Sequence, residues 1–269
     1  MSSFGVGRVS SLFVYPMSFD EFLTATGQEG LLRTKRNSSP TNPLPEAFYN
    51  RLVEAFRSYM LVGGMPEAVA TYTETGSYRY SSDIVNEIIQ GYQDDFAKYG
   101  AKANPLLLRQ TLISVAHQAG AKFVYSRVEG QYRSAEVKVA LEMLKDAGLI
   151  IPTYHTDANG ILLGAEINER VVKYLIHDTG VLLGILGIDD DIDDSIKEMM
   201  VADSINLVDK GHVAEMMAGL ELIKYSSPQK RHQLYYWQNM NKGTCAEVDY
   251  VIARSGSIVP IEVKLGVKG

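Results

Sequence analysis

Eighteen residues near the C-terminus of this 269-residue chain, EVDYVIARSGSIVPIEVK at positions 247–264, strongly favour a β-hairpin. Apolar and polar residues alternate on both sides of Ser255 and Gly256. This period of two is typical of half-buried strands, and a two-residue turn containing Gly joins antiparallel strands. Pro260 falls where a hairpin does not use the backbone N–H, so it does not interrupt the pairing. Antiparallel β-structure is therefore expected at this end of the chain.

Counting outward from the turn predicts which residues face each other. Asp249 lies opposite Glu262, and Glu247 lies opposite Lys264. Directly opposed residues share one face of a sheet, with Cβ atoms roughly 4.5–5.5 Å apart. Two carboxylates at that distance repel each other unless a proton, the Lys264 ammonium or a metal ion offsets their charge, and a divalent ion does so most strongly. The register therefore predicts a cluster of charged side chains on one face.

An acidic pair with a lysine two positions after the second acid is the arrangement used in metal-dependent phosphodiester hydrolysis. Asp249 and Glu262 would hold Mg²⁺ or Mn²⁺, which polarises the phosphate and lowers the pKa of its water. Lys264 would stabilise charge or help to activate the nucleophile. The pattern is short, and the polar face of a solvent-exposed strand also matches it by chance. A nuclease-like site and solvated strand residues are therefore both consistent with the sequence.

Residues 105–170 carry the pattern of a winged helix. A helix with apolar residues at helical spacing precedes a short basic stretch, a second helix that ends at Gly148, and a hairpin around Asn159 and Gly160. Asn-Gly between two strands is the strongest short signal for a two-residue hairpin turn. Domains with a helix-turn-helix bind DNA in the major groove, but the same fold also serves for packing alone.

The second helix of this region carries the candidate DNA contacts. It would expose Arg133, Lys138 and Lys145, side chains of the kind that meet DNA phosphates. Glu136 and Glu142 lie among them and would repel DNA. Residues 98–145 hold eight Lys or Arg against three Glu, although the whole chain has a net charge of −6. The charge pattern therefore leaves DNA binding and packing as alternatives for this region.

The N-terminal part is expected to be mostly helical. Residues 8–15 alternate like a strand, and Ser18 with Glu21 forms a capping box that starts a helix. Residues 34–45 are rich in Pro, Ser, Asn and Thr, which is typical of a linker. From residue 45 to residue 99 apolar residues recur at helical spacing, with a break at Gly63 and Gly64.

Composition excludes several classes of protein. Apolar residues make up 46% and charged residues 22%, close to globular averages, so neither a disordered chain nor a coiled coil is expected. Cys245 is the single cysteine, which rules out an intrachain disulfide and a cysteine-based zinc site and fits a reducing compartment. No apolar run approaches the roughly 20 residues that cross a bilayer. We expect a cytoplasmic protein without a membrane partner.

Several motifs, in their order along the chain, resemble a known family. They are GRVSSLFVYPMSFDEFL (7–23), LVGGMPEAV (61–69), HDTG (177–180), KGHVAEMMAGLEL (210–222), AEVDYVI (246–252) and IVPIEVK (258–264). Together they resemble prokaryotic AAA-type P-loop ATPases, from the end of the ATPase domain through the C-terminal region called domain of unknown function 4143. The resemblance implies an α+β, mostly helical fold. A helical and winged-helix region would precede a restriction-endonuclease-like α/β domain of the PD-(D/E)xK type.

The resemblance also assigns residues and boundaries. It matches Asp249, Glu262 and Lys264 to the catalytic D…E-x-K motif, and Glu215 to the preceding helix glutamate, so that Glu215, Asp249 and Glu262 would bind Mg²⁺ or Mn²⁺. It implies four regions: the end of a P-loop ATPase domain (1–33), a helical linker region (34–104), a winged-helix-like region (105–170) and a truncated restriction-endonuclease-like domain (171–269).

Two functions follow from these features. No Walker A sequence occurs in the 269 residues, so ATP is expected only in complete relatives, and the chain resembles a fragment. The first function is that of the C-terminal portion of an AAA-type ATP-binding protein that contacts DNA and holds a metal-dependent nuclease-like site. The second is a non-catalytic module that binds a protein partner or self-associates, or an inactive gene fragment.

Overall fold

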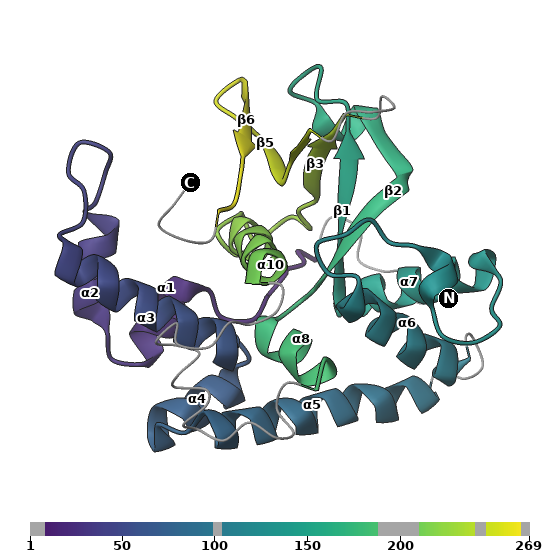
Figure 1. The fold of residues 1–269 in the computed structure, drawn as a ribbon, viewed down its shortest axis with the longest axis horizontal. Coiled ribbons are helices and arrows are strands. Elements are labelled where there is room, and N and C mark those ends of the chain that lie inside the picture. Colours follow the sequence, from purple (N-terminus) through teal and green to yellow (C-terminus); the bar gives the residue numbers. More distant parts are fainter. Residues whose placement is uncertain (1–8, 99–103, 188–209, 240–245, 265–269) are drawn as a thin grey trace.

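The computed structural model describes residues 9–98, 104–187, 210–239 and 246–264, which form an α+β fold that is mostly helical (Figure 1). Two short 3-10 helices, η1 (Tyr125–Arg127) and η2 (Leu163–Glu166), connect regular elements. The α-helices are α1 (Phe19–Ala25), α2 (Glu29–Arg36), α3 (Glu46–Val62), α4 (Pro66–Thr75), α5 (Tyr78–Lys98), α6 (Pro105–His117), α7 (Ser134–Asp146), α8 (Thr179–Ile185) and α10 (Lys210–Lys224).

The strands form a mixed four-stranded sheet and a separate hairpin. The sheet has the order β2-β1-β3-β4, in which β1 pairs antiparallel with β2 and parallel with β3, and β3 pairs antiparallel with β4. Its strands are β1 (Ile150–Thr156), β2 (Ile167–Ile176), β3 (Leu234–Gln238) and β4 (Glu247–Val248). The hairpin consists of β5 (Tyr250–Arg254) and β6 (Ser257–Ile261). One sheet thus joins strands from the middle and the C-terminal parts of the chain, and β2 runs across the division expected at 170/171.

The C-terminal hairpin has the predicted register. Arg254 pairs with Ser257, and Tyr250 pairs with Ile261 at the far end of the ladder. Ser255 and Gly256 have φ values of 51° and 77°, the left-handed values that a type I′ turn requires at both central positions. The turn chemistry therefore fixes the pairing, as the sequence indicated.

Two other strand predictions are wrong in detail. Residues 9–15 form no strand, and the side chain of Val14 is 89% exposed. Asn159 and Gly160 lie in the longer connection between β1 and β2 instead of a two-residue turn. Side-chain bonds hold that connection: the Thr156 hydroxyl donates to the Leu163 carbonyl, and the Asn159 N–H donates to the Glu166 carboxylate.

The predicted helix start and helix break both occur. Ser18 and Glu21 form the capping box of α1. At the break between α3 and α4, Gly63 has a φ of 77°, and a Cβ there would lie 2.2 Å from Oδ1 of Asp178. The N–H of Gly64 donates to Oδ2 of Asp178 at 2.6 Å. The motifs at 61–69 and 177–180 therefore meet and join the α3–α4 turn to the start of α8.

Helix α10 occupies a central place in this arrangement (Figure 1). It lies between the N-terminal helices and the sheet, and its inward side chains belong to a core that also includes residues of α1, α3, α6, α7 and β2. None of the helices in the described ranges is both long enough and apolar enough to cross a membrane.

Candidate metal centre

Glu215 is placed by the packing of α10. The helix buries Val213, Met216, Met217, Leu220 and Ile223, as its apolar spacing predicts, and Glu215 lies beside them with only 8% of its surface exposed. The Tyr250 hydroxyl donates to the Glu215 backbone carbonyl at 2.8 Å. That hydroxyl passes next to Gly219, where a Cβ would lie 2.4 Å from it. A glycine on α10 therefore allows β5 to approach the helix closely at Glu215.

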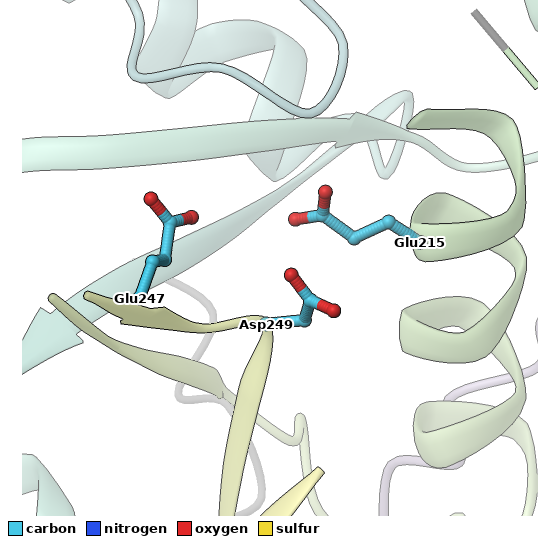
Figure 2. Close-up of side chains that lie close together, drawn as sticks. All are labelled: Glu215, Glu247 and Asp249. Carbon is cyan, nitrogen blue, oxygen red and sulfur yellow. The ribbon is translucent and has the colours of Figure 1, made fainter. Parts of the chain in front are cut away.

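Three carboxylates from this helix and the neighbouring strands come together (Figure 2). One ligand oxygen from each of Glu215, Glu247 and Asp249 lies within 4.8 Å of the other two. Glu247 projects from β4, and Asp249 lies at the bend between β4 and β5. The Asp249 carboxylate also accepts the N–H of Val263 at 2.7 Å, which holds the segment after β6 against this bend. A set of carboxylate oxygens suits Mg²⁺ or Mn²⁺ better than a softer metal.

Lys173 of β2 completes the cluster and was not anticipated from the sequence. It is 4% exposed, and its Nζ donates to Oε1 of Glu215 at 2.8 Å and also to Glu247. The same Nζ lies 5.0 Å from the ring centroid of Tyr236. A lysine within the otherwise apolar run VVKYLI is the signal that could have found it, because buried lysines are rare unless paired.

Electrostatics favour an ion pair at Lys173. Burial alone would lower the pKa of Lys173, but the carboxylates of Glu215 and Glu247 outweigh burial and raise it. Burial raises the pKa of Glu215, with further contributions from Asp249 and Glu247, while Lys173 opposes the rise. The direct contact at 2.8 Å is consistent with an ammonium facing a carboxylate.

The other predicted site residues are not members of this group. Glu262 and Lys264 follow β6, are exposed, and form an ion pair with each other. Glu262 is not a member of the three-carboxylate group, and the hairpin ladder ends one pair before Asp249. Of the predicted metal ligands, the structure thus brings Glu215 and Asp249 together and adds Glu247 in place of Glu262.

The predicted DNA contacts lie on α7 or directly before it. Arg133, just before the helix, and Lys138 are exposed, whereas Lys145 is half-buried and paired with Glu142. Arg231 donates to the Lys145 backbone carbonyl and so tethers the end of α7 to the segment before β3. Two of the three basic side chains are therefore free of a close acidic partner among the ion pairs of the described residues.

Comparison with known proteins places most of the chain in uncharacterised groups. The chain belongs to the family described as domain of unknown function DUF8612, which matches residues 53–192, just over half of its length. Residues 210–269 match domain of unknown function DUF4143, which is known from AAA-ATPase-associated proteins. The resemblance to the latter is therefore confirmed for the C-terminal region, whereas the motifs at 61–69 and 177–180 fall in the DUF8612 match. No curated protein and no solved structure matches the sequence.

Proposed function

We propose that the C-terminal part of this chain binds a divalent cation, Mg²⁺ or Mn²⁺, and forms a nuclease-like site acting on phosphodiester bonds. The observation that carries the proposal is the convergence of Glu215 on helix α10, Glu247 on strand β4 and Asp249 at the bend that follows β4. A metal ion held there would polarise a phosphate and lower the pKa of a water molecule. Lys173 and Lys264 are the nearby cations that would stabilise negative charge on the phosphate.

We extend the proposal to DNA as the substrate, contacted through α7. Exposed Arg133 and Lys138 offer phosphate contacts, and such contacts make binding weaken steeply as salt rises. Glu136 and Glu142 on the same helix act against binding. ATP would bind only to an ATPase domain of the kind found with DUF4143, and not to the residues described above.

A second candidate function is a non-catalytic interaction module. It is supported by Lys173, which already neutralises part of the carboxylate charge. It is also supported by an open cavity of about 530 Å³ between the end of α10 and strands β3 and β5, lined by Leu222, Leu234 and Ile252 among others. An apolar cavity of this kind accepts a side chain of a protein partner or of a second copy of the chain.

Titration calorimetry with Mn²⁺ separates the two functions. The parent protein should show saturable binding, and Asp249→Asn should abolish it, because one of three anionic ligands is lost. Asp83→Asn, a change of an exposed residue on α5, is the matched control and should bind like the parent. If the well-folded parent binds no Mn²⁺, the interaction module is the better assignment. Binding would justify cleavage assays on single- and double-stranded DNA.

A further inference from the structure

Lys173 supplies positive charge directly to the carboxylate cluster. It contacts two of the three acids directly, Glu215 and Glu247, and the third, Asp249, accepts only a backbone N–H among its described hydrogen bonds. An ammonium and a divalent cation at this place both depend on the negative charge of the same carboxylates, Glu215 and Glu247. Since like charges repel strongly at low dielectric, the two cannot share Glu215 and Glu247 without a loss of binding energy.

An independent feature points to a ligand at the same place. Four buried side chains of the described residues carry a polar atom without a hydrogen-bond partner, and three of them, Thr153, His155 and Tyr236, lie on one face of the sheet. Thr153 pairs with Lys173, and His155 pairs with Tyr236. Glu247 pairs with the residue two positions after Tyr236 and so lies on the same face.

Among these unpartnered groups, the Tyr236 hydroxyl belongs to the ring that contacts Lys173. Tyr236 is fully buried, and its ring lies beneath the Lys173 ammonium. Burial raises the pKa of Tyr236, and the negative charges of Glu247 and Glu215 raise it further, which places the phenol within their field. Buried polar groups normally have partners, so an unpartnered hydroxyl within the field of Glu215 and Glu247 is available to bind a water molecule of a hydrated ligand.

We propose that Lys173 is the resident counter-ion of this site and that a divalent cation binds by displacing its ammonium from Glu215 and Glu247. This inference rests on the proposed function and adds the residue that sets the affinity of the site. In the metal-free protein, Lys173 relieves the repulsion among the acids. With Mg²⁺ bound, the Tyr236 hydroxyl offers a hydrogen bond to the water that this ion retains in proteins.

Replacement of the lysine tests the competition. Lys173→Met should bind Mn²⁺ more tightly than the parent, on the order of tenfold or more, because the competing charge is gone. Lys230→Met, at an exposed position, is the matched control and should bind like the parent. An affinity that is equal or weaker in folded Lys173→Met overturns the inference. Absence of Mn²⁺ binding in both the parent and Lys173→Met instead overturns the proposed function.

A measurement on the unmodified protein covers the case in which Lys173→Met does not fold. In protein labelled with ¹³C at lysine Cε, addition of diamagnetic Mg²⁺ should shift the Lys173 resonance with the same midpoint as the calorimetric isotherm. The Lys230 resonance should stay in place. An unchanged Lys173 resonance at saturating Mg²⁺ would show that the ammonium keeps its contacts, and the inference would fail.

Discussion

His177 is buried and bonded through both ring nitrogens. Its Nδ1 donates to the Leu149 carbonyl at 3.1 Å, which leaves Nε2 to accept from the Tyr92 hydroxyl at 3.1 Å. Only the neutral imidazole ring can donate through one nitrogen and accept through the other. Burial lowers the pKa of His177, although the neighbouring Asp178 carboxylate opposes the shift. Protonation would therefore cost both a hydrogen bond and the desolvation of a charge.

Acid should destabilise the protein through this residue. Below about pH 6.5 the unfolded chain protonates His177, whereas the folded protein does not until a lower pH. The unfolded state then binds more protons, so the free energy of unfolding falls as the pH drops from 6.5 toward the folded pKa, by up to about 1.4 kcal/mol per pH unit. In urea unfolding between pH 7 and 5.5, His177→Gln should flatten this slope.

The control for this prediction is His117→Gln, a change of an exposed ring at the end of α6, which should keep the slope of the parent. A slope that is the same in His177→Gln and in the parent would contradict the assignment of acid sensitivity to this ring. The absolute stability of His177→Gln is also expected to drop, because both hydrogen bonds of the imidazole ring change.

Single residues at the site were only partly predictable. Asp249 and Glu215 could be selected because carboxylates at those positions match a family motif. The apolar neighbours of Lys173 mark it as a buried lysine, but its partners could not be predicted, because Glu215 and Glu247 are 42 and 74 residues away in sequence. Glu262 was expected opposite Asp249, but the ladder ends one pair earlier and the exposed Glu262 carboxylate pairs with Lys264. Long-range packing, which local patterns do not encode, decides which acids converge.

At the scale of elements, the contact between α10 and β5 positions the site. Gly219→Ala should disturb it, because the new Cβ would lie 2.4 Å from the Tyr250 hydroxyl and 2.8 Å from Leu175. The helix must move outward, at a cost of roughly 1–3 kcal/mol, and Glu215 moves with it. We expect a lower melting temperature and weaker Mn²⁺ binding by calorimetry.

Gly211→Ala on the same helix is the matched control. Nothing lies within 4 Å of its Cβ position, so the change should be neutral or stabilise the helix by up to about 1 kcal/mol. If Gly219→Ala were as stable as Gly211→Ala and bound Mn²⁺ like the parent, close packing at Gly219 would not be what places Glu215.

Elements were predictable where local chemistry alone decides them. The β5–β6 turn needs left-handed backbone at two adjacent residues, and Ser-Gly supplies it. The α1 capping box likewise involves residues three apart. A strand over residues 9–15 would need a neighbouring strand, but in this segment Phe13 bonds only to the Pro228 carbonyl among the described turn and loop contacts. An alternating pattern favours a strand, but a strand also needs a neighbouring strand with which to pair.

At the scale of the whole molecule, the N-terminal helices and the C-terminal elements share one core that runs from Phe19 to Tyr250. A buried polar network crosses it. The Tyr59 hydroxyl of α3 lies 2.6 Å from the Met17 carbonyl and 2.8 Å from the Glu221 carboxylate, and it accepts from Lys224 at 2.6 Å. These contacts connect α3 and the segment before α1 with α10. The chain should therefore unfold as one cooperative unit.

Two probes can test this cooperativity. Trp237, the single tryptophan, lies on β3 and reports on the sheet by fluorescence, whereas far-ultraviolet circular dichroism reports mainly on the helices. The two thermal transitions should coincide. Tyr59→Phe removes the central hydroxyl of the network and should cost about 2 kcal/mol, which corresponds to a decrease of roughly 4–8 °C in both transitions.

Tyr49→Phe on the same helix is the matched control, since Tyr49 is 51% exposed and the change should alter stability by less than about 0.5 kcal/mol. A Trp237 transition that stays at the parent temperature in Tyr59→Phe, while the helical signal melts earlier, would show that the sheet folds independently of α3. A common shift would mean that α3 and the sheet unfold together, connected through α10, which carries both Glu221 and Glu215.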